Sequence, residues 1–186
     1  FVDEIQTFAR TSQLFAFQYF GLEEYVDLVT IGKVSQVCAT LYKDHLSPKP
    51  GLLSQTFTAS SSAIGASKAM IKHLLEEGFY GDEGRIQRIH DYLSSKLEAI
   101  SEEDPYLIQG PFGIGSMVAF TVFEGDKDKT LKFLKNLYEM GVIAFLAGDS
   151  PARVRFLLPV PAIDVKDIDC VVKICYEALL KTKAEF

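Results

Sequence analysis

The sequence predicts an α/β fold, on two observations. Apolar, β-branched runs at 26–31 and 37–42 are typical of buried strands, and segments with helical spacing lie on either side of them. After residue 101 the pattern becomes strand, strand, helix, strand, strand, helix, which is typical of a compact α+β unit. We therefore expect one part over residues 1–80 and a second part over residues 81–186.

The composition suits a soluble, folded protein. The chain has 186 residues, 48% of them hydrophobic, which is enough for a sizeable core. Its net charge of −6, without a basic patch, argues against nucleic-acid binding, and this acidic balance is ordinary for a cytoplasmic protein. No apolar stretch is long enough to span a bilayer and no signal peptide opens the chain, so we expect no membrane partner.

The first residues suit the end of a strand that has no beginning. We therefore expect this chain to be the C-terminal part of a longer protein. Asp3 and Glu4 stand where that strand ends. Ligands of open α/β sheets bind outside the carboxyl ends of the strands, so either acid is a candidate ligand contact. The alternative is a solvated acidic turn.

Two helices are expected in the first part. Thr11 or Ser12 can cap a short one over residues 13–19, and Gly21 ends it. The second starts after the Ser/Thr cluster at 56–62, which can either bind an anion or simply cap the helix. Its apolar face would contain Ala63, Ala66, Met70, Ile71, Leu74 and Leu75.

Lys33 lies on a short turn between the two predicted strands, just after Gly32 breaks the first one. A lysine placed there would be held by rigid backbone and would be buried. Burial disfavours the ammonium form and lowers the pKa, which suits an amine nucleophile that forms Schiff bases. The alternative is that Lys33 faces water, as most lysines at strand ends do.

The second part is expected to contain four strands and three helices. The strands are expected at 106–109, 116–123, 142–146 and 153–158. The helices are expected at 83–100, 126–140 and 164–181, the last one capped by Asp164. Their inward residues would be Ile86, Ile89, Leu93, Leu97 and Ile100, then Leu131, Leu134, Leu137 and Tyr138, then Ile168, Val171, Cys175 and Leu179.

Arg153 and Arg155 alternate on one predicted strand, so both point to the same face of it. A guanidinium on an otherwise apolar strand is a candidate for holding a carboxylate, because it offers a bidentate fork. The alternative is an edge strand with solvated charges.

Histidine and cysteine give no metal or disulfide pattern. His45, His73 and His90 are far apart in sequence, and we interpret them as packing or surface residues. Cys38, Cys170 and Cys175 form neither a disulfide framework nor a zinc site. A hydrolase based on Cys38 is disfavoured, because Cys38 is expected in a buried strand and no histidine has a supporting motif.

Several segments together resemble the class III (ω-type) pyridoxal-phosphate aminotransferases. Residues 3–7 with Arg10-Thr11 are similar to the Asp-Glu-Val-Gln-Thr-Gly…Arg-Thr signature of that family. The segment around Lys33 is similar to the branch of lysine ε-aminotransferases, with 4-aminobutyrate aminotransferases more distant. Further similar segments are Thr56-Phe57, 112–117 and Arg153–Phe156, which is followed by Pro159.

The resemblance implies a fold type I transferase with pyridoxal phosphate as cofactor. Residues 1–80 would be the C-terminal part of the large cofactor-binding domain, and 81–186 the small domain. Lys33 would bind the cofactor as a Schiff base and shuttle the proton, and Asp3 would pair with the pyridine nitrogen. Gln6 would lie near the 3-oxygen of the ring. Thr56 would donate to the phosphate across a homodimer interface.

The resemblance also implies that Arg155 grips a substrate carboxylate. Arg153 lies one strand step outside the matched position. The chain departs from the family pattern at Phe8, Ser12, 58–60 and Phe112, which leaves the substrate pocket and the exact phosphate contacts open. The upstream half of the family is not in these residues, so we do not expect them to transaminate by themselves.

The implied function is transfer of an amino group from an ω-amine to a 2-oxo acid such as 2-oxoglutarate. The amine would be a lysine ε-amine or resemble 4-aminobutyrate. An aminomutase or a decarboxylase of the same fold would use the same Lys33 and Asp3. A non-catalytic scaffold is a further alternative, and intact Lys33, Asp3, Gln6 and Arg155 argue against it.

Overall fold

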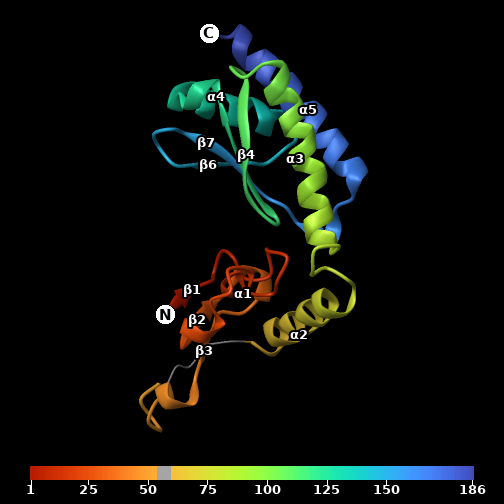
Figure 1. Ribbon diagram of the computed structural model, residues 1–186. Coiled ribbons are helices and arrows are strands. Elements are labelled where there is room, and N and C mark those ends of the chain that lie inside the picture. The colour runs from red at the N-terminus through yellow and green to blue at the C-terminus, as the bar shows by residue number, and fades with distance from the viewer. Residues whose placement is uncertain (54–59) are drawn as a thin grey trace. The chain divides into compact units, whose positions relative to one another are not determined.

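The computed structural model describes residues 1–53 and 60–186 (Figure 1). The chain divides into two compact units, Phe1–Arg85 (unit 1) and Ile86–Phe186 (unit 2). Each unit has its own sheet.

Unit 1 is built on a three-stranded sheet of order β1–β2–β3. The strands are β1 (Val2–Asp3), β2 (Leu28–Ile31) and β3 (Ala39–Tyr42). β1 runs parallel to β2 and β3 runs antiparallel to it. Val29 and Ile31, which alternate along β2, are both buried, so the predicted buried strand before Lys33 is confirmed. The strand after Lys33 begins at Ala39, two residues later than predicted.

The first helix is shorter than predicted and is capped differently. α1 spans Ala16–Tyr19, and its first N–H groups are satisfied by the carboxylate of Glu4. Thr11 is fully buried, and its hydroxyl bonds the backbone of Gln13 in a local turn. The prediction that Thr11 or Ser12 caps a helix from Gln13 is therefore wrong.

The second helix, α2 (Ser61–Glu76), is present as predicted, but it begins inside the Ser/Thr cluster, two residues earlier than expected. The Ser60 hydroxyl accepts the N–H of Ala63 at 3.2 Å and caps it. Within the described residues its predicted apolar face is only partly covered. Leu74 is buried, whereas Leu75 is 57% exposed.

Unit 2 contains a four-stranded antiparallel sheet of order β4–β5–β7–β6. Its strands are β4 (Ile108–Ile114), β5 (Met117–Val122), β6 (Phe145–Ala147) and β7 (Arg153–Leu157). β4 runs further than the predicted 106–109. The sheet tolerates Pro111 there because the register shifts between Gln109 and Phe112, which is a bulge at an edge strand.

Three helices pack in unit 2: α3 (Arg85–Glu103), α4 (Lys127–Glu139) and α5 (Val165–Ala184). Every predicted inward residue of α3 is buried, and Asp164 caps α5 as predicted. α3 and α5 run side by side, and the Tyr92 hydroxyl donates to the Asp169 carboxylate at 2.8 Å (Figure 1). α4 packs on β5, where the rings of Phe120 and Phe133 meet edge to face.

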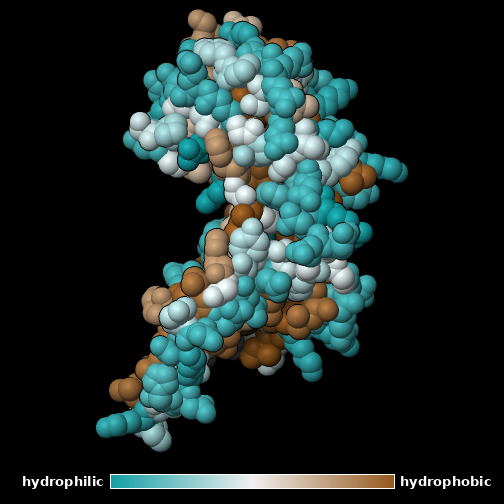
Figure 2. Space-filling model, in the orientation of Figure 1, coloured by the Kyte–Doolittle hydropathy of each residue, from teal (hydrophilic) through white to brown (hydrophobic). Residues whose placement is uncertain are grey.

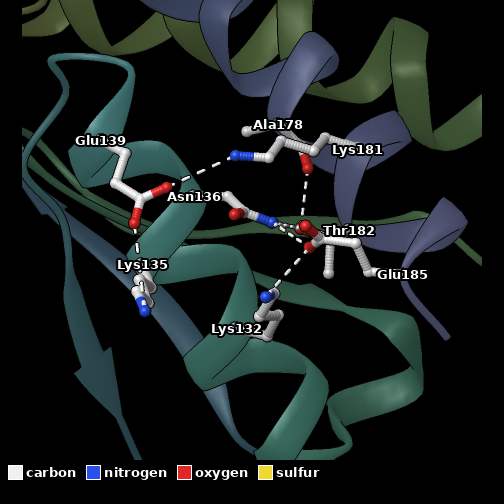
Figure 3. A network of polar contacts seen from close by, with 8 residues as sticks. All are labelled: Lys132, Lys135, Asn136, Glu139, Ala178, Lys181, Thr182 and Glu185. Carbon is white, nitrogen blue, oxygen red and sulfur yellow. Dashed lines mark hydrogen bonds and ion pairs between the residues drawn. The ribbon is translucent and has the colours of Figure 1, made fainter.

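The inward face of α4 differs from the predicted one. Leu131 and Tyr138 are exposed, whereas Phe133, Asn136 and Leu137 are buried. The hydrophobic pattern does not predict that Asn136 is buried, because a buried asparagine is tolerated only when its amide has hydrogen-bond partners. The Asn136 amide donates to the Thr182 hydroxyl on α5 at 2.9 Å and to the Glu185 carboxylate at 2.8 Å (Figure 3).

Hydrophobic side chains are exposed over much of unit 1, where the brown surface gathers in Figure 2. Among the large ones are Phe20, Tyr25, Leu41, Leu52 and Ile64. Contiguous apolar surface of this kind is typical of faces that other parts of a protein cover. Among the described residues, no helix is long and apolar enough to cross a membrane.

Candidate active site

The carboxyl ends of β1 and β2 meet at one edge of the unit 1 sheet. The register pairs Asp3 with Thr30, so the segments that follow, with Gln6 and Lys33, leave the sheet at that same edge. This is the position at which open α/β sheets bind ligands. The structure therefore brings three of the sequence-predicted site residues to one place in unit 1.

The two acids at the end of β1 have different surroundings. The Asp3 carboxylate is exposed, and one of its oxygens accepts the N–H of Ile5 at 2.9 Å and the hydroxyl of Thr30 at 3.3 Å. Glu4 is fully buried, and it accepts the N–H groups of Ala16 and Phe17 at 2.8 Å each. Asp3 is thus open to a ligand, whereas Glu4 is committed to holding α1.

Gln6 carries an unsatisfied donor. Its side-chain Nε2 is buried and has no hydrogen-bond partner within residues 1–53 and 60–186. A buried amide without a partner costs free energy, so such a group is normally matched by an acceptor. Gln6 therefore marks a place where an oxygen of a ligand would be stabilised.

Lys33 begins a 3₁₀ turn, Lys33–Ser35, directly after β2. Its side chain is exposed, so the prediction of a buried lysine is wrong for the described residues. Burial of a turn depends on what packs over it, and α2, which contacts this turn, leaves the Lys33 side chain uncovered. Lys33 is also in the left-handed backbone region, with φ of 55°. Such strain in a non-glycine residue costs free energy and is found most often at functional sites.

Cys38 likewise differs from expectation. It lies before β3, not in it, and it is exposed. Cys38 is therefore not the buried strand residue that the sequence predicts.

Arg153 and Arg155 lie on β7 of unit 2 and point to the face opposite buried Val154 and Phe156. The Arg153 guanidinium lies 4.8 Å from the ring centre of Phe112, and its Nε donates weakly to Thr121. The Arg155 guanidinium lies 5.9 Å from the ring centre of Phe145.

The Nε of Arg155 is buried and has no hydrogen-bond partner in the part of the chain that the structure describes. Arg155 is therefore the better placed of the two arginines to receive a carboxylate.

The remaining predicted positions add no ligand group. Thr56 lies outside the described residues. The Nδ1 of His90 donates to the Gly115 carbonyl at 2.7 Å, which is a packing contact. No group of three or more His, Cys, Asp or Glu side chains that could hold a metal ion occurs in residues 1–53 and 60–186.

The sequence did not predict two residues that contact the site residues. Thr30, which fixes the Asp3 carboxylate, could have been found from the parallel pairing that puts it opposite Asp3. Gln36, whose side chain bonds the backbone of Lys33, gave no signal in the sequence.

Comparison with known proteins identifies the family. The family model for class III aminotransferases matches residues 1–179. The chain belongs to this family. It is 30% identical to the acetylornithine aminotransferase of Oceanobacillus iheyensis, over 99% of the chain and 44% of the relative. It is 25% identical to the L-lysine-epsilon aminotransferase of Mycobacterium tuberculosis, over 95% of the chain and 39% of the relative.

Solved structures agree on the fold. The lysine aminotransferase of M. tuberculosis superposes with a TM-score of 0.84 at 23% identity, over 97% of this chain and 41% of that one. The ornithine δ-aminotransferase of Plasmodium falciparum superposes with a TM-score of 0.78 at 22% identity, over 100% of this chain and 48% of that one. The predicted fold type I architecture is confirmed. The chain spans 39–44% of the length of the two curated relatives named above.

Proposed function

We propose that this chain carries the lysine-bearing part of a pyridoxal-phosphate-dependent aminotransferase. The observation that supports it most is the gathering of Asp3, Gln6 and Lys33 at one edge of the unit 1 sheet. Membership of the class III family supports it independently. In this proposal residues 1–80 belong to the large cofactor-binding domain, and residues 81–186 form the small domain.

The described residues suit the cofactor. The unpaired Nε2 of Gln6 would donate to the 3-oxygen of the ring, which gives that buried amide its missing partner. The exposed Asp3 carboxylate would pair with the pyridine nitrogen and keep it protonated. Asp3 is held for this role by Ile5 and Thr30, so its orientation is fixed by backbone and neighbouring strand.

Lys33 would supply the reactive amine. When bound there, pyridoxal phosphate serves as an electron sink for the carbanion formed at the substrate carbon. The amine of Lys33 would hold the cofactor at its aldehyde and would move the proton at the substrate carbon. Its exposure among the described residues leaves the amine accessible.

The substrate proposal combines relatives and site. We propose an ω-amine donor and a 2-oxo acid acceptor such as 2-oxoglutarate. Names of the relatives point to such donors, since they include lysine-epsilon and 5-aminovalerate aminotransferases. Arg155, with its unpaired buried Nε, would receive the carboxylate of the substrate as a bidentate pair.

The assembly proposed is a homodimer in which Thr56 donates to the cofactor phosphate of the partner subunit. The exposed hydrophobic surface of unit 1 suits a chain that is covered by other protein (Figure 2).

The test is an absorbance spectrum of the complete protein, purified with pyridoxal phosphate. We expect a visible band, and after borohydride reduction we expect the adduct on the peptide that contains Lys33. Lys33→Ala should abolish the stable adduct. Lys43→Ala is the matched control, because Lys43 is another exposed lysine of unit 1 and pairs with Asp27 at 3.1 Å. A wild-type protein that stays colourless in excess cofactor would refute the proposal.

A further inference from the structure

The turn that carries Lys33 contains two strained residues. Lys33 has φ of 55° and Gln36 has φ of 61°, both in the left-handed region, and neither is glycine. A non-glycine residue in this region costs free energy, and it persists only where the surrounding structure holds it. The turn must therefore contain contacts that keep this backbone in place.

Those contacts converge on the Lys33 carbonyl. The backbone N–H of Gln36 donates to it at 3.0 Å, and the side-chain Nε2 of Gln36 donates to the same oxygen at 3.2 Å. A carbonyl oxygen has two lone pairs, so the two donors of Gln36 together can occupy both. Gln36 is thus the residue that fixes the peptide plane from which the Lys33 side chain starts.

Other contacts hold the remaining residues of the turn. Ser35 is fully buried, and its hydroxyl donates to the Val37 carbonyl at 2.6 Å. Gly32 lies against Ile5 and Cys38, whose side chains would be in contact with a Cβ there. These contacts fix both ends of the turn and leave the Lys33 carbonyl to Gln36.

We propose that Gln36 is a positioning residue for Lys33. Its amide keeps Lys33 in the left-handed conformation and so aims the amine at the cofactor aldehyde. This inference rests on the proposed function, because it needs Lys33 as the amine that captures the cofactor. The Gln36 side chain is exposed, so its hydrogen bond contributes little to the free energy of unfolding. Removing that bond should therefore affect the position of Lys33 more than the stability of the protein.

The experiment follows capture of pyridoxal phosphate by the cofactor-free complete protein. In this step the Lys33 amine condenses with the aldehyde and releases water. The variant is Gln36→Met, which keeps side-chain length and adds no charge but removes the donor. We expect the rate of appearance of the visible band to fall about three- to tenfold. We also expect the midpoint of the band's pH titration to move by about half a pH unit.

Two further variants keep the test decisive. Gln36→Gly retains the backbone N–H contact and adopts the left-handed region at no cost, so it removes the side-chain bond even if Gln36→Met folds poorly. Gln109→Met is the control, because it makes the same exchange at an exposed position of β4. Its rate and midpoint should equal those of the wild type.

The outcomes separate the two proposals. If the wild type forms no adduct at Lys33, the proposed function fails. If the wild type forms it and both Gln36 variants match its rate and its titration midpoint, the function stands and the role of Gln36 is refuted. Slower capture and a shifted midpoint, with unchanged melting temperature, support the positioning role.

Discussion

Among single residues, Glu4 makes the buried contacts that hold α1 in unit 1. Its buried carboxylate accepts two backbone N–H groups of α1 and the Thr7 hydroxyl. Glu4→Ala would leave these donors without partners, so we expect the free energy of unfolding to fall by about 2–4 kcal/mol. Denaturant unfolding of the complete protein measures this. Asp3→Ala removes an exposed neighbouring charge and should cost under about 1 kcal/mol; equal losses for the two variants would contradict the assignment.

The cysteines differ in burial and should therefore differ in reactivity. Burial in the apolar core of unit 2 raises the pKa of Cys175 to about 12. The thiolate is the nucleophile, so Cys175 should resist iodoacetamide at pH 8 in the folded protein and react after denaturation. Cys170, on the exposed side of the same helix, is the internal comparison and should be labelled in the folded state. Peptide mass spectrometry reads both sites, and labelling of folded Cys175 at the rate of Cys170 would contradict this account.

For single residues, the sequence predicted the place along an element better than it predicted burial. It placed Asp3 at the end of a strand, which the structure confirms, because strand ends follow from local apolar runs. It did not distinguish exposed Asp3 from buried Glu4, since that depends on where α1 lies, thirteen residues further along. It expected Lys33 to be buried, and burial of a turn is decided by segments distant in sequence. The roles of Asp3, Gln6 and Arg155 stay predictions.

Between elements, the network that joins α4 to α5 has a pH signature (Figure 3). The Asn136 amide, followed by the Lys132 ammonium, holds the pKa of the Glu185 carboxyl below its ordinary value of 4.5. Because the folded-state pKa is the lower one, the stabilisation is present above pH 4.5. It is lost as the pH falls through the folded-state value.

We therefore expect Glu185→Gln to lower the melting temperature at pH 7 and to have a smaller effect near pH 3, below the ordinary pKa of 4.5. Glutamine keeps an acceptor for Asn136 but cannot pair with Lys132, which lies at 3.3 Å. Glu177→Gln, at an exposed site on α5, is the control and should show no such pH-dependent difference. A melting-temperature difference for Glu185→Gln that is the same at pH 7 and pH 3 would refute the pH dependence.

The elements themselves were predicted unevenly, for a physical reason. The stripe of α3 is purely apolar, and all five predicted residues are buried. The face of α4 includes Asn136, and a pattern based on hydrophobicity cannot foresee that an amide is buried when its partners, Thr182 and Glu185, lie on and just beyond another helix. The length of β4 was also missed: the strand was expected to end at 109, but it continues to Ile114 through a bulge between Gln109 and Phe112.

For the whole molecule, the sequence predicted the α/β class and two successive parts, because hydrophobic periodicity and the order of motifs extend along the entire chain. The family resemblance, read from several weak motifs in the right order, is confirmed by a family model over residues 1–179. What the local pattern does not contain is the relation between Lys33 and Arg155, which lie in different units.

Cofactor linkage tests the molecule as a whole. A ligand that binds only the folded state stabilises it by RT ln(1 + [L]/Kd), about 2.7 kcal/mol at a hundredfold excess over Kd. We therefore expect pyridoxal phosphate to raise the melting temperature of the complete wild-type protein. Lys33→Ala loses the covalent bond but keeps Asp3 and Gln6, so it should retain part of the increase in melting temperature.

Gln6→Leu removes the unpaired donor, so it should weaken binding while leaving the cofactor-free protein as stable as before or slightly more stable. Melting curves with and without cofactor measure all three proteins, and a Gln6→Leu protein that binds as tightly as the wild type would show that Nε2 has no acceptor on the cofactor.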